Sequence, residues 1–511
     1  MIETRNLGFL YDASRDGERV ALIDCRDWEQ PRHFTHREIH EAANACARGL
    51  VRRGLNRGDA VAILSANRAE FLIAYLGTLR AGLVAVPFSY KFTREVIAFV
   101  LEDAAVKLVL CDDPRRSLLD TELPIASFDD DGPSGFGALL DPGPFEVFQP
   151  EDSDVAMVLY TSGSTGRPKG VPLTHKGHLW ALRKRLVGGP FEDHRLLVAA
   201  PLYHMNALCV SLFSLAVSAQ EVLLPEFDAA QYLAAIERFG CTWITSVPTM
   251  LAMCFARPDL VSRTDVSSVR IVRMGSAPIS PKLWAQVKHT FPGASVMNGY
   301  GTTEAGPIVF GARPGKTVPD LSVGYQADEV DVRLIDDAGN ESDQGVLVHR
   351  TPATMTGYLN LPEKTGEVLS PDGWYNSGDV FRRESDGAYY FVGRSDDMFV
   401  CGGENIFPGE VEAVLVSHPA VSEACVVPVP DDIKGEKPIA FVVADPRADL
   451  SETDVKQHAL RNAPAYQHPR MVQFLDSLPL AGPGKIDRNG LTRRGRELWD
   501  ALPDEQRRSG G

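Results

Sequence analysis

The chain lacks the features that would place it in a membrane, outside the cell or on nucleic acid. Its longest apolar stretch, residues 207–219, is shorter than the roughly 20 residues that a membrane-spanning helix needs. Residues 1–24 contain no basic segment followed by an apolar block, as a secretory signal would. Because 68 acidic residues outnumber 52 basic ones, the net charge is −16, which disfavours general binding to nucleic acid or anionic lipid. We therefore expect a cytoplasmic protein with no nucleic-acid partner and no stable membrane insertion.

Cysteine pairs are also lacking. The eight cysteines are scattered, and no two of them form a C-x-x-C pair. Most lie inside apolar stretches, which is typical of buried free thiols in a reducing compartment. The cysteine pattern therefore gives no support for a zinc site. The eight are Cys25, Cys46, Cys111, Cys209, Cys241, Cys254, Cys401 and Cys425.

What is present is an ordinary globular composition in a chain of 511 residues, a length that favours two or more domains. Up to about residue 323, apolar runs typical of buried strands alternate with helical patterns, which predicts α/β layers with largely parallel sheets. The expected strands are 61–65, 107–111, 155–160 and 243–247, and the expected helices are 37–53, 71–81 and 229–239. Beyond residue 323, short strand-like runs at 330–335, 345–349 and 388–392, separated by turns, predict a β-rich subdomain, and an α+β unit follows Arg394.

The most informative segment directly follows the predicted strand 155–160. It reads Tyr160-Thr-Ser-Gly-Ser-Thr-Gly-Arg-Pro-Lys-Gly170. Glycines let the backbone turn its N–H groups inward, hydroxyls add donors, and Lys169 adds a cation, so the segment suits a polyphosphate. Its spacing is not that of a Walker A loop. The alternative, a flexible Ser/Gly surface loop, is disfavoured by the preceding strand and by the lysine.

This segment resembles the phosphate loop of the adenylate-forming superfamily, which includes acyl-CoA synthetases, aryl-CoA ligases, nonribosomal adenylation domains and luciferases. Seven further segments resemble the same family in the same order along roughly the whole chain. They are Pro201-Leu-Tyr-His-Met-Asn206, Gly275-Ser-Ala-Pro278, Asn298-Gly-Tyr-Gly-Thr-Thr-Glu304, Tyr375-Asn-Ser-Gly-Asp379, Gly393-Arg-Ser-Asp-Asp397, Gly402-Gly-Glu-Asn-Ile406 and Pro483-Gly-Lys-Ile-Asp-Arg488.

The resemblance implies an α/β protein with two domains. A large N-terminal domain of layered α/β subdomains plus a β-rich subdomain would span residues 1–394 and bind ATP and the acyl substrate. A small mobile α+β C-terminal domain would span residues 395–511. The implied activity is that of an acid–thiol ligase, which adenylates a carboxylic acid with ATP and passes the acyl group to coenzyme A.

Attack by a carboxylate on the α-phosphate of ATP brings two anions together, so the site must supply cations, a metal and oriented donors. The resemblance implies that Lys485 bridges the substrate carboxylate and the α-phosphate. It also implies that Glu304 binds Mg²⁺, because magnesium prefers carboxylate and phosphate oxygens. Thr161 and Thr303 would supply hydroxyls to the phosphates or the metal shell. The expected catalytic set is Lys485, Glu304, Thr161 and His204.

The resemblance also implies where the nucleoside binds. Tyr300 would pack against adenine, with the main chain of residues 275–278 on its other face. Asp379 would accept hydrogen bonds from both ribose hydroxyls, and Arg394 would add a second contact. The full set of expected ATP- and AMP-binding residues is Thr161, Ser162, Gly163, Ser164, Thr165, Gly166, Lys169, Gly275, Ser276, Ala277, Pro278, Asn298, Gly299, Tyr300, Gly301, Thr303, Asp379 and Arg394.

Asp396 stands at the family's hinge position, which implies two orientations of the C-terminal domain. One orientation would bring in the Lys485 segment for adenylation. The other would bring in a loop that faces coenzyme A, where a Gly-Gly pair permits close approach of the pantetheine arm. The residues expected to face coenzyme A are Gly402, Gly403, Glu404 and Asn405.

The acyl pocket is less well defined. His204 resembles a gate position in related ligases, although a lone histidine is more often a satisfied core residue. If Asn206 faces the pocket, the substrate should carry a polar group, since a buried amide without a partner costs about 1–3 kcal/mol. Ser246, Val247, Gly275 and Ile308 are further candidates for the pocket wall. Medium-chain, branched and aryl acids all stay open.

Two other functions compete with the acyl-CoA synthetase. A stand-alone adenylating enzyme could load a carrier protein or form an amide, and a degenerate nucleotide-binding scaffold would have no activity. The segment 479–485 fits P-x-x-x-x-G-K, which resembles sites where the catalytic lysine is reversibly acylated, so a regulatory lysine acetyltransferase is an implied partner. The oligomeric state, a homodimer included, is left open.

Overall fold

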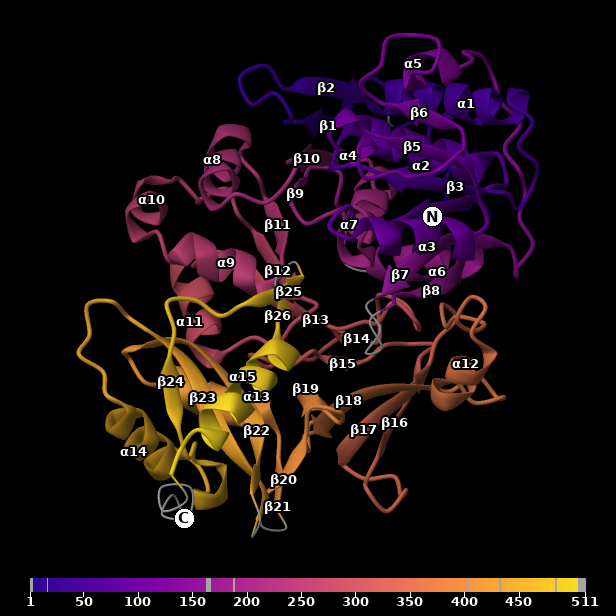
Figure 1. The fold of residues 1–511 in the computed structure, drawn as a ribbon. Helices are drawn as coiled ribbons and strands as arrows, with labels where there is room; N and C mark the ends of the chain where they lie inside the picture. Colours follow the sequence, from indigo (N-terminus) through magenta and orange to yellow (C-terminus); the bar gives the residue numbers. More distant parts are fainter. Residues whose placement is uncertain are drawn as a thin grey trace.

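The computed structural model describes residues 3–15, 17–161, 167–186, 189–401, 404–431, 434–482 and 485–503, without the side chains of Asn405 and Lys485. Two large sheets make up most of the N-terminal part, drawn from indigo to magenta in Figure 1. The predicted α/β fold class is confirmed. No helix among the described residues is both long enough and apolar enough to cross a bilayer.

The first large sheet has six strands in the order β6-β5-β3-β4-β7-β8. Its pairs are parallel except the last, where β7 and β8 run antiparallel and form the two sides of the phosphate loop. The strands are β3 (Ala60–Leu64), β4 (Val84–Pro87), β5 (Val106–Cys111), β6 (Ile125–Ser127), β7 (Val155–Thr161) and β8 (Lys169–Thr174). Every residue of β3 is buried, as its unbroken apolar sequence predicts.

The second large sheet has seven strands in the order β13-β12-β11-β9-β10-β1-β2. Only its β1–β2 pair is antiparallel. The strands are β1 (Val20–Asp24), β2 (Arg32–Thr35), β9 (Arg195–Val198), β10 (Gln220–Leu223), β11 (Trp243–Ser246), β12 (Ile271–Gly275) and β13 (Ser295–Gly299). β11 ends one residue earlier than its apolar run predicts, because Val247 is the extended residue before Pro248 at the start of the next helix.

Helices cover both sheets, and one hydrophobic core includes residues of both sheets and of α1, α2, α6 and α7. The N-terminal helices are α1 (His36–Arg52), α2 (Ala69–Arg80), α3 (Arg94–Asp103), α4 (Asp113–Arg116), α5 (Phe136–Leu139), α6 (His175–Arg185), α7 (Met205–Ala216), α8 (Ala229–Phe239), α9 (Pro248–Phe255), α10 (Pro258–Arg263) and α11 (Pro281–Thr290). All eight cysteines are buried and free, as their apolar surroundings predict.

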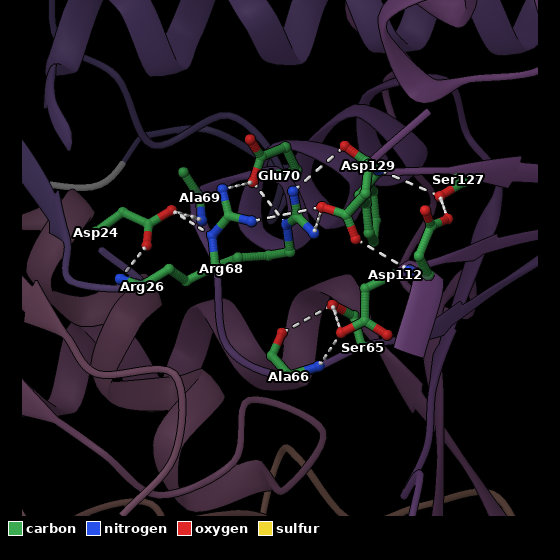
Figure 2. A network of polar contacts seen from close by, with 12 residues as sticks. Asp24, Arg26, Ser65, Ala66, Arg68, Ala69, Glu70, Asp112, Ser127 and Asp129 are labelled. Atoms are coloured by element: carbon green, nitrogen blue, oxygen red, sulfur yellow. Dashed lines mark hydrogen bonds and ion pairs between the residues drawn. The ribbon is translucent and has the colours of Figure 1, made fainter. Parts of the chain in front are cut away.

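A polar network ties the two large sheets together (Figure 2). We call it the carboxylate–guanidinium network. Its members are Asp24, Arg26, Arg32, Arg68, Glu70 and Asp129. Arg68, whose side chain is 4% exposed, donates to both Glu70 and Asp129 at 2.7 Å. At the end of β1, Asp24 accepts from the backbone N–H of Ala69, the first residue of α2, at 3.1 Å. The network therefore fixes a strand of one sheet to the helix that follows a strand of the other.

The β-rich subdomain follows the second sheet. It contains a four-stranded antiparallel sheet in the order β16-β17-β18-β19, with the short pair β14–β15 beside it. Its elements are β14 (Phe310–Gly311), β15 (Tyr325–Gln326), β16 (Asp331–Ile335), β17 (Gln344–Arg350), α12 (Pro362–Val368), β18 (Tyr375–Arg383) and β19 (Tyr389–Arg394). The predicted strands 330–335, 345–349 and 388–392 correspond to β16, β17 and β19.

The C-terminal α+β unit, in orange and yellow in Figure 1, has its own sheet in the order β21-β20-β23-β22, with β24 paired to β23. Its two cores lie on opposite sides of this sheet, one including α13 and α14 and the other α15. The elements are β20 (Phe399–Cys401), β21 (Glu404–Ile406), α13 (Pro408–Val416), β22 (Val421–Asp431), β23 (Gly435–Ala444), α14 (Glu452–Asn462), a 3₁₀ turn (Ala465–Gln467), β24 (Val472–Phe474), β25 (Leu480–Gly482), β26 (Lys485–Ile486) and α15 (Arg488–Asp500).

Candidate active site

The two ends of the phosphate loop face each other. Thr161 ends β7, Lys169 begins β8, and the two residues are partners in the β7–β8 ladder. Ser162, Gly163, Ser164, Thr165 and Gly166, which the sequence predicts to bind phosphate, lie outside the described residues. The hydroxyl oxygen of Thr161 is buried and has no hydrogen-bond partner among the described residues. A buried hydroxyl without a partner is rare in folded proteins, so this one is suited to a ligand.

Lys169 connects the phosphate loop to Glu304 through Tyr358. Lys169 Nζ donates to Tyr358 Oη at 3.0 Å, and the tyrosine hydroxyl donates to Glu304 Oε1 at 3.0 Å. Burial first, and then the negative charge of Glu304, raise the pKa of Tyr358, so its hydroxyl keeps its proton. Tyr358 is a residue that the sequence analysis missed, because it lies outside the segments that carried the resemblance.

A second cluster lies at the meeting of β18 and β19. Arg394 Nη1 donates to Asp379 Oδ1 at 3.1 Å, and the hydroxyl of Tyr300 donates to Asp379 Oδ2. Burial raises the pKa of Asp379, although these two donors act in the opposite direction. Arg394 also donates from Nε and Nη2 to both carboxylate oxygens of Asp396, at 2.9 and 3.0 Å. One guanidinium thus joins the expected ribose acceptor to the expected hinge residue.

The expected nucleoside segments lie side by side on β12 and β13. Gly275 pairs with Gly299, and a Cβ added to Gly275 would come within 2.6 Å of the Gly299 carbonyl oxygen, so a side chain there would clash. Ser276 has a φ of 68°, a conformation that costs energy for a residue with a side chain. Asn298 instead donates its side-chain amide to Leu321 O at 2.9 Å, which gives it a structural contact.

Four other expected nucleoside residues continue these segments. Ala277 is half-buried and Pro278 is exposed. A Cβ added to Gly301 would meet Gly306 O at 2.7 Å, and Thr303 is half-buried in the same loop as Glu304.

The expected acyl-pocket residues come from several places. His204 is exposed and immediately precedes α7. Ser246 ends β11, and its buried hydroxyl has no hydrogen-bond partner among the described residues. Val247 follows Ser246 and immediately precedes α9. Ile308 packs in the same cluster as Tyr300.

Another expected acyl-pocket residue, Asn206, has a partner that the sequence analysis missed. Arg273 Nη1 donates to Asn206 Oδ1 at 2.7 Å. Arg273 lies within the apolar sequence of β12, where nothing in the sequence distinguishes it from a strand residue that reaches solvent.

The C-terminal site residues are only partly placed. Lys485 begins β26, which pairs with β25 in a hairpin, but its side chain lies outside the described atoms. Glu404 is exposed at the start of β21 and pairs with Cys401. Gly402, Gly403 and the Asn405 side chain also lie outside the described part. The described residues therefore form one cluster around Glu304 and a second around Asp379. The ammonium group of Lys485 lies outside the described atoms.

Known proteins resemble this chain over nearly its whole length. Residues 9–359 match the family model described as AMP-binding enzyme, and residues 410–485 match that of the AMP-binding enzyme C-terminal domain. A 4-coumarate–CoA ligase from Solanum tuberosum is 30% identical over 94% of this chain and 92% of its own length. A feruloyl-CoA synthase from an Amycolatopsis species is 34% identical, over 90% and 94% of the two chains respectively.

The anthranilate CoA ligase AuaEII, solved in complex with anthranoyl-AMP, superposes with a TM-score of 0.88 at 28% identity, covering 97% of this chain and 98% of that one. The chain therefore belongs to the AMP-binding enzyme family, among the adenylate-forming acyl- and aryl-CoA synthetases.

Proposed function

We propose that this protein activates a carboxylic acid with ATP and transfers the acyl group to coenzyme A. A carboxylate oxygen attacks the α-phosphorus, the bond to the β-phosphate oxygen breaks, and pyrophosphate leaves. The thiol of coenzyme A then attacks the acyl carbon of the acyl-adenylate, losing its proton, and AMP leaves. The observation that carries this proposal is the contact series from Lys169 through Tyr358 to Glu304, beside the Thr161 hydroxyl, which has no hydrogen-bond partner among the described residues.

The residues of this series suit the triphosphate of ATP and its metal. Glu304 and the hydroxyls of Thr161 and Tyr358 are hard oxygen donors, which fit Mg²⁺ held jointly by protein and phosphates. No cluster of three or more His, Cys, Asp or Glu side chains suited to a metal exists in the described ranges, so phosphate oxygens would complete the shell. When bound, Mg²⁺ neutralises charge on the phosphates, and Lys169 adds a cation beside them.

The Asp379 cluster suits the ribose. Its carboxylate is buried, and Tyr300 and Arg394 hold its two oxygens in place. In this proposal the ribose hydroxyls donate to Asp379, while Tyr300 and the backbone around Gly275 hold the adenine. In this proposal Asp396, which accepts two hydrogen bonds from Arg394, acts as the hinge between a domain at 1–394 and a domain at 395–511. Breaking the contact between Arg394 and Asp396 would let the C-terminal domain rotate from the orientation for adenylation to the orientation for thioester formation.

The test is AMP and pyrophosphate release from ATP and Mg²⁺ across a panel of carboxylic acids, each with and without coenzyme A. Lys485→Ala should lower the rate of adenylation by about 100-fold or more, because it removes the cation at the attacked phosphate. Lys456→Ala, in the same domain but on α14 and paired with Glu452, is the control and should act as wild type.

Each outcome decides between functions. AMP release that needs both a particular acid and coenzyme A, and is lost in Lys485→Ala, supports the ligase. If pyrophosphate release depends on the acid but is not accelerated by coenzyme A, the acyl acceptor is a carrier protein or an amine. Full adenylation by enzyme acetylated at Lys485 would contradict regulation by a lysine acetyltransferase. Failure to bind ATP would overturn the proposed function itself.

A further inference from the structure

Two arginines near Asn206, an expected acyl-pocket residue, repel each other electrostatically. We call Arg185 and Arg273 the arginine pair. Arg185 ends α6, Arg273 lies in the middle of β12, and neither forms an ion pair with an acidic side chain within the described ranges. A Cβ added to Gly299 would come within 2.7 Å of Arg273 Nη2. Arg273 therefore lies against the segment that carries Tyr300 and Glu304.

The contacts that the pair does make leave its charge uncompensated. Arg273 Nη1 donates to the neutral amide oxygen of Asn206, and Arg185 Nη2 is buried without a hydrogen-bond partner among the described residues. Cys209, one turn beyond Asn206 on α7, could become an anion, and it interacts electrostatically with both arginines. Burial raises the pKa of Cys209, so it stays a neutral thiol and is no counter-ion.

Arg273 does not become neutral by losing its proton. Burial and the neighbouring charge of Arg185 lower the pKa of Arg273, but only to about 9, so the guanidinium stays charged at neutral pH. Both arginines are half-buried, and a charge withdrawn from water without a counter-ion is costly, the more so beside a second charge of the same sign. Such an arrangement persists where an anionic ligand completes it.

Resting on the proposed function, we propose that the arginine pair binds a second carboxylate on the acyl substrate, so that the preferred substrate is a dicarboxylic acid. A carboxylate has two oxygens that can accept from guanidinium groups, and its charge would offset theirs. One end of the acid is held by Arg185 and Arg273 while the other end is adenylated near Glu304. Asn206 holds Arg273 in position rather than contacting an uncharged substituent.

The experiment compares linear dicarboxylic acids of increasing length, and aryl dicarboxylic acids, with their monomethyl esters, which keep the length but lose one charge. The measured quantity is kcat/KM for pyrophosphate release. The wild type should prefer each accepted diacid over its ester by about 100-fold, since losing a buried charge pair costs a few kcal/mol. Arg273→Met and Arg185→Met should reduce that ratio to near one, and Arg273→Lys, which keeps the charge, should restore part of it.

Arg270→Met is the matched control, because Arg270 is exposed just before β12 and should leave the ratio at its wild-type value. The proposal is overturned if the wild type uses esters and diacids equally, or if the ratio survives in both methionine variants. If no acid of either kind gives pyrophosphate, thermal melting decides. Diacids must then raise the melting temperature of the wild type more than that of Arg273→Met, and the proposal is overturned if they do not. If ATP does not raise the melting temperature either, the result counts against the proposed function.

Discussion

The carboxylate–guanidinium network and the arginine pair both contain arginines shielded from water, but they differ in whether acidic side chains lie beside them. In the network, Arg68 is nearly enclosed but contacts Glu70 and Asp129, and Arg32 contacts Asp24 and Glu70. In the pair, Arg185 and Arg273 have no acidic partner among the described residues. Buried arginines that pair with carboxylates stabilise the fold, whereas arginines without a described acidic partner are free to bind an anionic ligand.

Carboxyl groups show the same contrast. Glu70 and Glu221 are both glutamates held away from water. Burial alone would raise the pKa of Glu70, but hydrogen bonds from Arg32 and Arg68 outweigh it and lower the pKa to about 2. Glu221 has only Ser211 beside it at 2.9 Å, and burial raises its pKa to about 8. A carboxyl without a cation can take up a proton, and an arginine without an anion cannot release one.

The largest expected effect comes from breaking the matched network. Arg68→Met should lower the free energy of unfolding by about 3–5 kcal/mol, because it removes a buried guanidinium and leaves the half-buried Glu70 and the more exposed Asp129 without one of their cations. Urea unfolding measures it. Arg263→Met is the control, since Arg263 pairs with Asp259 on the surface and should cost at most about 0.5 kcal/mol. Equal losses in the two variants would contradict a structural role for the network.

The next effect depends on pH. The pKa of Glu221 is about 8 in the folded protein against an ordinary 4.5, so folding favours the protonated form. Its contribution to stability is complete below pH 4.5 and declines as pH rises toward 8. Glu221→Gln removes this dependence, so between these pH values the variant should gain about 4 kcal/mol on the wild type.

Urea unfolding of both proteins at several pH values measures this difference. A difference that does not change with pH would show that Glu221 is ionised throughout.

The smallest expected effect sharpens the contrast between matched and unmatched arginines. Arg185→Met without ligand should leave the unfolding free energy unchanged or raise it by about 1 kcal/mol, because it replaces a half-buried charge that has no acidic partner among the described residues with an apolar side chain. Thermal melting measures it, with and without a dicarboxylic acid. A loss of several kcal/mol, like that expected for Arg68→Met, would mean that Arg185 has a structural partner.

Local patterns predicted most of the elements. The apolar spacing over residues 229–239 predicts α8 with its observed bounds, and the run at 155–160 predicts β7 one residue short. Strand order was not predictable, because it depends on which distant strands pair. The motifs likewise pointed to Glu304 and Asp379, but Tyr358, which lies between Lys169 and Glu304, belongs to no motif and was found only in the fold.

The sequence by itself determined the family, the α/β class and the chemistry, because motifs and periodicity are properties of neighbouring residues. It could not distinguish Arg68 from Arg273, since both stand beside apolar residues in segments that are buried. Whether a buried guanidinium meets a carboxylate depends on side chains brought together from remote parts of the chain. The tertiary structure decided that Arg68 has such partners and that Arg273 has none among the described residues, and so made one arginine part of the scaffold and the other a candidate for binding substrate.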